Sequence, residues 1–353
     1  MRKRLMTVLG VLVAVAVVVA AGFVLLGGDD QDADRTTLAG ALRLAPLDSQ
    51  RLSWTDWAAV RREVGLDLSS ASPGAAVQDL LDRGFEADLT QSTALGSSAI
   101  EMQQRLGFSP ATLDWELFSQ APRLAAITMR AGPEVDFDFV ASSLREAGYE
   151  EPADSLDPWV SDPTVDEITS QVTPTLLLIA LDRESSMIYA SDTTAGVQAA
   201  LDAAAAAESQ AVPDDVVTAA GEPLSASLYT GDQACSALAM ALADQTDVET
   251  GRGLVAAAGE VNPLTGFSIG AYGDGGVRVV MSFETEEQAR TNAETRAVLA
   301  TGPAPGQGGD FADRFALESA TATGQVVVLE LDPVPGAYVL SDLSAGPVLF
   351  ATC

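Results

Sequence analysis

The side chains that could carry out catalysis are limited, because this chain of 353 residues contains no histidine and Lys3 is its only lysine. Ser-His-Asp and Cys-His nucleophile systems need a base near neutrality, and histidine is the usual one. Catalytic zinc sites mostly bind through histidine as well. No Gly-x-Ser-x-Gly motif occurs, and a Ser-x-x-Lys motif is impossible with Lys3 as the only lysine. The chemistry that remains uses carboxylates, serine or tyrosine nucleophiles, or metals bound through oxygen.

Carboxylates are abundant, but their arrangement in the sequence singles out no catalytic pair. A glycosidase needs two of them a few ångströms apart around a sugar bond, and any chain with 50 acidic residues could supply such a pair. Trp54 and Trp57 could stack on sugar rings, although their helical spacing favours packing against other helices. We therefore predict no catalytic residues.

Neither a metal site nor a cofactor site is predicted. The acidic loop between Asp154 and Glu167 has the oxygen ligands that calcium prefers, but it lacks Asp-x-Asp-x-Asp-Gly spacing and its prolines favour a solvated surface loop. Two glycine-rich stretches, 273–276 and 306–309, match neither of the common phosphate-binding loops. We interpret them as a hairpin turn and a flexible loop.

Cys235 and Cys353 are the two cysteines, and both follow the apolar segment at the start of the sequence. An even number of cysteines outside the cytoplasm indicates a disulfide. A Cys235–Cys353 bridge is therefore predicted, with two unpaired thiols as the alternative. Such a bridge would join residues 348–353, which we expect to form a strand, to the middle of the fold.

The charge balance argues against binding to nucleic acid. The sequence has 50 acidic and 19 basic residues, a formal net charge of -31, and a polyanion would be repelled by a protein of that sign. The carboxylates are spread along the chain rather than grouped, so solubility explains the charge better than cation binding at a cell surface. Apolar residues make up 47% of the chain, which is enough for a core and excludes global disorder.

Residues 1–28 are predicted to be a transmembrane signal anchor. Three basic residues at positions 2–4 precede an uncharged run that ends at Gly28, and at ~1.5 Å per residue this run can cross a bilayer core of about 30 Å. An acidic tether over residues 29–45 follows, and this order of charges predicts a cytoplasmic N-terminus and an extracytoplasmic C-terminal domain. The alternative is a secreted protein whose signal peptide is cleaved, although the apolar run is longer than signal peptides usually have.

The elements that would position a site begin with a small helical region, residues 46–121. Apolar residues at helical spacing, with glycine or proline at the boundaries, predict four helices there. They cover residues 53–65, 72–84, 100–107 and 109–118.

An antiparallel-sheet domain is expected from residue 122 onward. Residues 122–212 follow the order β-α-β-β-α, and residues 213–353 follow it again before ending in C-terminal strands. This pattern suggests two repeats in which Met129 matches Tyr229 and Tyr189 matches Met281, with an unduplicated domain as the alternative. The predicted fold class is α+β.

Several short motifs resemble those of uncharacterised membrane-anchored and exported proteins of high-GC actinobacteria. They are the N-terminal anchor, Trp54-Thr55-Asp56-Trp57, Asp313-Arg314-Phe315 and the closing Leu349-Phe350-Ala351-Thr352-Cys353. The preference for arginine over lysine is similar to that of the same proteomes. The resemblance implies a cell-envelope protein and carries over no functional residue.

The sequence thus predicts a membrane-anchored extracytoplasmic protein without enzymatic activity, a binding or scaffolding module of the cell envelope. Its expected partners are the membrane, through the N-terminal helix, and an envelope protein or glycan. One alternative is a carboxylate-based hydrolase acting on envelope glycans, which would need a deep cleft with two facing acids. Another is a carrier of lipids or small molecules, which would need a sizeable apolar cavity between sheet and helices.

Overall fold

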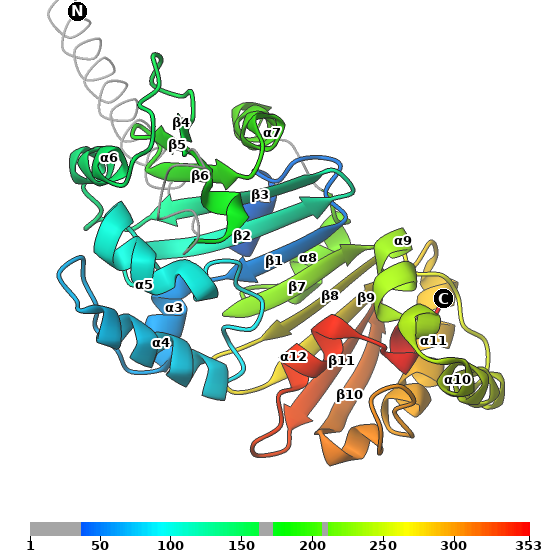
Figure 1. The fold of residues 1–353 in the computed structure, drawn as a ribbon. Coiled ribbons are helices and arrows are strands. Elements are labelled where there is room, and N and C mark those ends of the chain that lie inside the picture. The colour runs from blue at the N-terminus through cyan, green and yellow to red at the C-terminus, as the bar shows by residue number, and fades with distance from the viewer. Residues whose placement is uncertain (1–36, 162–171, 207–210) are drawn as a thin grey trace, which may run out of the picture.

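The computed structural model describes residues 37–161, 172–206 and 211–353 (Figure 1). These residues form a mixed α+β fold around one 11-stranded antiparallel sheet, which confirms the predicted class. Across the sheet the strands follow the order β10 (Phe315–Thr323), β11 (Val326–Pro333), β9 (Val277–Ser282), β8 (Gly266–Ala271), β7 (Ser225–Thr230), β1 (Arg51–Thr55), β2 (Leu113–Ala121), β3 (Leu124–Ala131), β6 (Met187–Ser191), β5 (Leu178–Asp182) and β4 (Trp159–Val160).

Helices cover both faces of this sheet, so its strands bury side chains on both sides. One face packs against α2 (Leu38–Leu42), α7 (Thr194–Ala206) and α8 (Asp214–Ala220). The other carries α3 (Trp57–Glu63), α4 (Gly74–Glu86), α5 (Ala99–Glu101), η2 (Met102–Leu106), α6 (Phe137–Glu146), α9 (Gly231–Gln233), η5 (Ala234–Leu238), η6 (Met240–Leu242), α10 (Gln245–Ala258), α11 (Glu286–Ala300), α12 (Val339–Ala345) and η8 (Leu349–Ala351). Short 3-10 turns lie at η1 (Gly96–Ser98), η4 (Pro174–Leu176) and η7 (Phe311–Asp313).

The strand order is symmetric about the central pair β1–β7, which is antiparallel with Ser53 opposite Ser227. Outward from β1 come β2, β3, β6 and β5, and outward from β7 come β8, β9, β11 and β10. In each half a strand is followed by helices, a hairpin, one helix (α6 or α11), a second hairpin and a last helix (α7 or α12). The two halves therefore share one strand order, although α7 and α12 pack on opposite faces of the sheet.

The repeat expected from the sequence matches strands that are not equivalent in the sheet. We matched Met129 with Tyr229, which pairs β3 with β7, whereas the sheet order makes β3 equivalent to β9. In the same way Tyr189 on β6 corresponds to β11, and Met281 lies on β9. Alternation along a strand indicates that it lies in a sheet, but not which strands lie beside it.

The expected helical region also contains two of the central strands. Residues 51–55 and 113–121 form β1 and β2, where helices were predicted over 53–65 and 109–118. In β1, Leu52 and Trp54 point to the core beside α2, and the residue between them, Ser53, points to the opposite face. This period of two was overlooked because Trp57 and Val60, which follow in α3, do have helical spacing.

Both ends of the described chain differ from expectation as well. Residues 38–42, placed in an acidic tether, form α2 because Leu38, Ala41 and Leu42 are apolar and bury against the sheet. Residues 349–351, expected in a terminal strand, form the 3-10 helix η8. In the described parts of the chain, no helix has the length and apolar character needed to cross a bilayer. The predicted anchor, residues 1–28, lies outside those parts.

Candidate functional site

A groove of about 620 Å³ lies between α10 and the segments that pack beneath it, η5, η6 and the residues after η8. Figure 1 shows α9, α10 and the C-terminus gathered at one end of the molecule. Most of the lining is apolar or small, Arg252 is its one charged side chain, and no acidic residue contributes. The lining residues are Cys235, Ala239, Met240, Val248, Gly251, Arg252, Val255, Ala256, Thr352 and Cys353.

Helix α10 forms the outer side of this groove. It begins at the N-cap Asp244, whose side chain accepts a hydrogen bond from the Asp247 amide at 2.9 Å. Gly251 is its one buried residue, and a Cβ there would lie 3.2 Å from Leu349 Cδ1 and 3.4 Å from Met240 Cε. Val248, Leu254, Val255 and Ala258 on the same helix are partly buried against the core as well.

The opposite side of the groove includes a disulfide between Cys235 and Cys353, which confirms the predicted pairing. The bond joins η5 to the residue after Thr352 across a sequence separation of 118 residues. It fixes the C-terminal segment beside η5, so the two parts of the chain form one continuous surface.

A buried arginine on α11 holds the same segment from below. Arg296 is 0% exposed, and its Nη1 donates to the carbonyls of Phe350, at 2.7 Å, and Thr352. Its Nη2 donates to the Asn262 carbonyl at 2.8 Å and its Nε to Asn292 Oδ1 at 3.1 Å. Burial lowers the pKa of Arg296 to about 9, and these neutral acceptors partly replace the water that its charge has lost.

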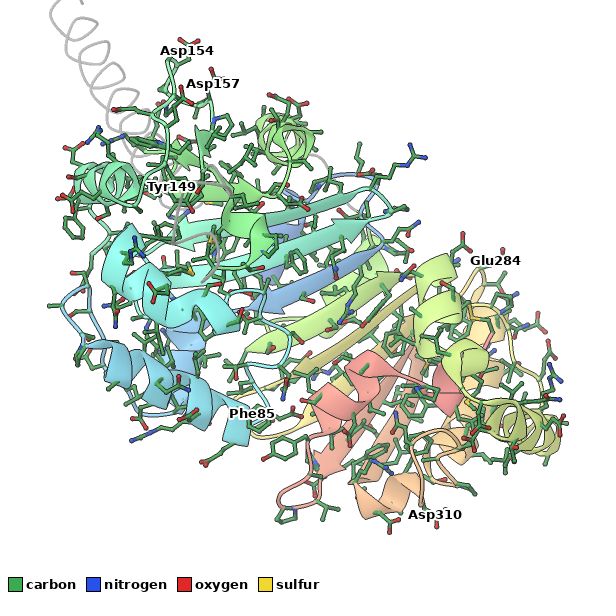
Figure 2. The ribbon with its side chains drawn as sticks, viewed as in Figure 1. Phe85, Tyr149, Asp154, Asp157, Glu284 and Asp310 are labelled. Carbon is green, nitrogen blue, oxygen red and sulfur yellow. A yellow bond between two sulfur atoms is a disulfide. The ribbon has the colours of Figure 1, made fainter. Side chains whose placement is uncertain are left out.

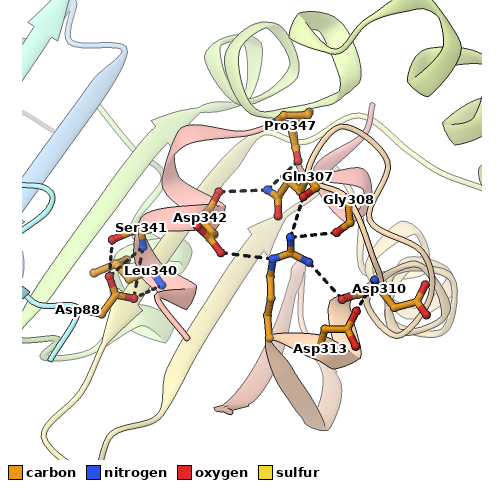
Figure 3. A network of polar contacts seen from close by, with 10 residues as sticks. Asp88, Gln307, Gly308, Asp310, Asp313, Leu340, Ser341, Asp342 and Pro347 are labelled. Carbon is orange, nitrogen blue, oxygen red and sulfur yellow. Dashed lines mark hydrogen bonds and ion pairs between the residues drawn. The ribbon is translucent and has the colours of Figure 1, made fainter. Parts of the chain in front are cut away.

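A second arginine network fixes the chain that leads to η8 (Figure 3). Arg314 donates to the carbonyls of Gln307, at 2.9 Å, and Asp310, at 3.2 Å, and its Nε lies 3.3 Å from Asp342 Oδ2. Gln307 Nε2 in turn donates to the Pro347 carbonyl at 2.9 Å. Loop 302–310, α12 and the approach to η8 are therefore connected before the chain reaches the groove.

The groove has the chemistry of binding rather than of acid–base catalysis. Its polar side chains are Thr352 and Arg252, and its two sulfur atoms are joined in the disulfide. No acidic side chain, lysine or free thiol lines it. Its volume lies within the ~300–1,000 Å³ of small-molecule sites, which are mostly apolar with a few polar groups.

The carboxylates with the clearest perturbation lie elsewhere. Glu116 on β2 is buried, and its carboxylate accepts hydrogen bonds from Trp57 Nε1 at 2.9 Å and from the Ala94 amide at 2.8 Å. Burial raises the pKa of Glu116 to about 7 against these hydrogen bonds. The carboxylate is enclosed by protein donors, so it has no access to a substrate.

A smaller hollow of about 240 Å³ contains three acids, Glu63, Glu86 and Asp88. Asp88 is fastened to α12, because it accepts from the Leu340 amide at 2.6 Å and from the amide and hydroxyl of Ser341 (Figure 3). Burial raises the pKa of Asp88 to about 6. Within residues 37–161, 172–206 and 211–353, no group of three His, Cys, Asp or Glu side chains could hold a metal ion.

The remaining residues singled out in the sequence do not meet at a site. Trp54 lies on β1 with its ring 5.4 Å from that of Trp115, while Trp57 opens α3 on the other face of the sheet. Both are buried, so neither is available to stack on a sugar. Figure 2 shows Asp154 and Asp157 projecting from an outer loop, and both are exposed. The other acids of that loop, at 162–167, lie outside the described residues.

Sequence reasoning missed both the groove and Glu116. Helix α10 was not predicted, because Gly251 and Gly253 interrupt its apolar pattern and glycine has a low helix propensity. Asp244 before the helix is an N-cap signal that could have indicated it. Nothing in the sequence distinguishes Glu116 from the other acids, because its burial depends on strand pairing.

Comparison with known proteins gives little further guidance. No family model matches the sequence, and no curated protein matches it. The chain is similar to a solved structure described as "Structure of crystal form I of TP0453", with a TM-score of 0.42 and 7% sequence identity. The alignment covers 88% of this chain and 97% of that one. A likeness this distant does not bear on function.

Proposed function

We propose that this chain is a non-enzymatic binding module and that the groove beneath α10 holds its ligand, a small molecule that is largely apolar. The observation that supports this proposal is the set of residues lining the groove. Most of them are apolar or small, although the chain has a formal net charge of -31. The absence of acidic side chains from a surface of this size favours an apolar ligand, because burying a carboxylate against apolar atoms is costly.

The proposal also covers location. Residues 1–28 would anchor the protein in a membrane with the described residues on the extracytoplasmic side, where they would meet ligands of the cell envelope. The disulfide between Cys235 and Cys353 supports this, because such bonds persist mainly in oxidising compartments. The groove lies on the surface beneath α10 rather than between sheet and helices, so a ligand could enter without opening the core.

A titration with the neutral fluorescent dye N-phenyl-1-naphthylamine tests the proposal. The dye should bind with saturable fluorescence enhancement at one site per chain. The variant Ala256→Trp fills the groove from α10 and should weaken binding at least about tenfold, because the dye loses its contact area.

Ala257→Trp is the matched control. Ala257 is the next residue on the same helix and is exposed like Ala256, but it does not line the groove. Its variant should bind the dye as the natural sequence does. Dye binding that never saturates, or that falls equally in both variants, would overturn the groove as the binding site.

A further inference from the structure

We infer that the protein touches its membrane a second time, through a lipid-facing patch around α7. This patch, the α7 surface, consists of Leu47, Leu156, Leu201, Ala205 and Ala206. The partner that fits it is a lipid surface with zwitterionic head groups. The inference rests on the membrane anchor of the proposed function and adds a contact that the anchor alone does not provide.

Helix α7 carries little charge for a surface helix of this chain. Asp202 is the one charged residue among its 13, whereas α4, with 13 residues, has four and α11, with 15, has five. One face of α7 buries Val197 and Ala200 against the sheet. Its last two residues, Ala205 and Ala206, are exposed, so apolar side chains occupy part of the outer face as well. A helix that is apolar on most of its sides is ordinarily covered.

Two exposed leucines from separate loops lie beside this helix. Leu47 is 76% exposed and borders a hollow of about 520 Å³ together with Ala206. Leu156 is 47% exposed and borders a second hollow, of about 170 Å³, together with Leu201 and Ala205. Single exposed apolar residues are common on proteins, whereas a group of them around one helix indicates a contact with a partner or a membrane.

The length of the tether brings this surface close to the bilayer. Residues 29–36 connect the proposed anchor to Thr37, the first described residue, and eight extended residues span at most about 29 Å. Leu47 follows ten residues after Thr37, and Leu44 from the same segment borders the hollow beside Leu156. The anchor therefore holds the α7 surface near the lipid, while the groove beneath α10 lies at the other end of the molecule (Figure 1).

Acidic side chains around the α7 surface select the kind of lipid. Asp48 and Asp202 border the larger hollow, and Asp154 and Asp157 project from the loop that carries Leu156 (Figure 2). Anionic head groups would repel these carboxylates and a chain of net charge -31. Zwitterionic head groups have no net charge, so apolar contact can bring the surface onto the lipid.

A fluorescent reporter on α7 tests this contact. Cys235 and Cys353 are the two cysteines of the sequence and are joined to each other, so Ala206→Cys provides the one thiol available to a nitrobenzoxadiazole label. The labelled full chain would be reconstituted into phosphatidylcholine vesicles with and without a lipid that bears a doxyl quencher near its head group. The reporter should lose most of its fluorescence to the quencher, because it lies against the lipid.

Val298→Cys supplies the control position for the label. Val298 is 56% exposed on α11, which packs against β10 and β11 at the far edge of the sheet. A label there should keep its fluorescence in the same vesicles. Equal loss at both positions would show that the lipid does not select the α7 surface, and would overturn the inference.

Substitution of the leucines assigns the contact to the α7 surface. Leu47→Gln and Leu156→Gln together should restore most of the fluorescence of the reporter at position 206, because the patch loses its two most exposed large apolar side chains. Leu242→Gln is the matched control, since Leu242 is 70% exposed on η6 beside the groove, and it should leave the quenching unchanged. Quenching that persists in the double variant would contradict the assignment.

Vesicle composition and flotation complete the test. Anionic phosphatidylglycerol in place of part of the phosphatidylcholine should weaken the quenching at low ionic strength, and stronger quenching would rule out a zwitterionic surface as the preferred partner. A full chain that floats with the vesicles but keeps its fluorescence at position 206 would overturn the α7 surface and leave the anchor in place. A full chain that does not float would show that the proposed anchor is wrong, and the inference would fail with it.

Discussion

At the scale of single residues, the most consequential polar group is Glu116, whose buried carboxylate accepts hydrogen bonds from protein donors in place of water. Its two carboxylate oxygens accept from the Trp57 indole and the Ala94 amide, so it links the sheet to α3 and to the segment before η1. Desolvation nevertheless outweighs these hydrogen bonds, and the pKa of Glu116 is raised to about 7. The protonated form of Glu116 is therefore favoured in the folded chain below about pH 7.

This shift predicts a pH dependence of stability. Glu116 would ionise near pH 4.5 when unfolded and near pH 7 when folded. The folded state binds more protons between these values, so the free energy of unfolding should fall as pH rises through that window and level off above it. The contribution is about 3 kcal/mol. Chemical denaturation across the window should show the fall in the natural sequence, and Glu116→Gln should reduce it.

Two further groups serve as checks on that experiment. Asp88, with its pKa raised to about 6, should leave a smaller fall in the Glu116→Gln variant. Glu63→Gln removes an exposed carboxylate from α3 and should leave the fall unchanged. If Glu116→Gln has the same pH profile as the natural sequence, Glu116 is ionised throughout the window and its assigned role is wrong.

At the scale of elements, the C-terminal segment depends on contacts made far away in the sequence. The carbonyls of Phe350 and Thr352 accept from Arg296, and the Phe350 ring packs 5.2 Å from that of Phe311. The disulfide adds a covalent restraint at Cys353. Residues 348–353 were expected to form a strand, but residues 349–351 form η8, and a buried arginine, aromatic packing and the disulfide hold the segment.

Loss of the disulfide should therefore loosen the groove as well as the fold. A bond across 118 residues stabilises by up to about 4–5 kcal/mol in the chain-entropy model, and often by less. Reduction with dithiothreitol should lower the midpoint of thermal unfolding and weaken dye binding, because one side of the groove is released.

The double variant Cys235→Ser, Cys353→Ser supplies the control for reduction. It should match the reduced protein and show no response to dithiothreitol. Reduced protein that binds the dye as tightly as the oxidised form would show that the groove does not depend on the disulfide.

At the scale of the whole molecule, the two topologically similar halves share one sheet and one core. The pair β1–β7 joins them through five paired positions from Arg51–Tyr229 to Thr55–Ser225. The larger apolar cluster extends from Trp57 and Ile127 in one half to Phe267 and Phe350 in the other. Neither half could separate without exposing the central strands.

This continuity predicts that the described part of the chain unfolds cooperatively. Scanning calorimetry of the oxidised protein should give one transition, with a calorimetric enthalpy equal to the van't Hoff enthalpy. Near-ultraviolet and far-ultraviolet circular dichroism should change together. Two separated transitions would show that the halves fold as independent units despite the shared sheet.

The sequence by itself determined the properties that depend on composition and local pattern. Absence of histidine, the acidic charge and the apolar content come directly from the residues. The hairpin turn at residues 273–276, which joins β8 to β9, was predicted, since it follows from local turn chemistry. The disulfide followed from the count of cysteines.

Tertiary structure alone decided which strands neighbour each other, and with them the site. Strand pairing placed β1 and β2 at the centre of the sheet, determined which strands of the two halves correspond, and buried Glu116. The groove is formed by α10, η5, η6 and Cys353, which come from two separate stretches of the sequence. The local sequence pattern indicates which side chains of a segment are buried. A groove, by contrast, depends on which segments, distant in the sequence, leave space between them.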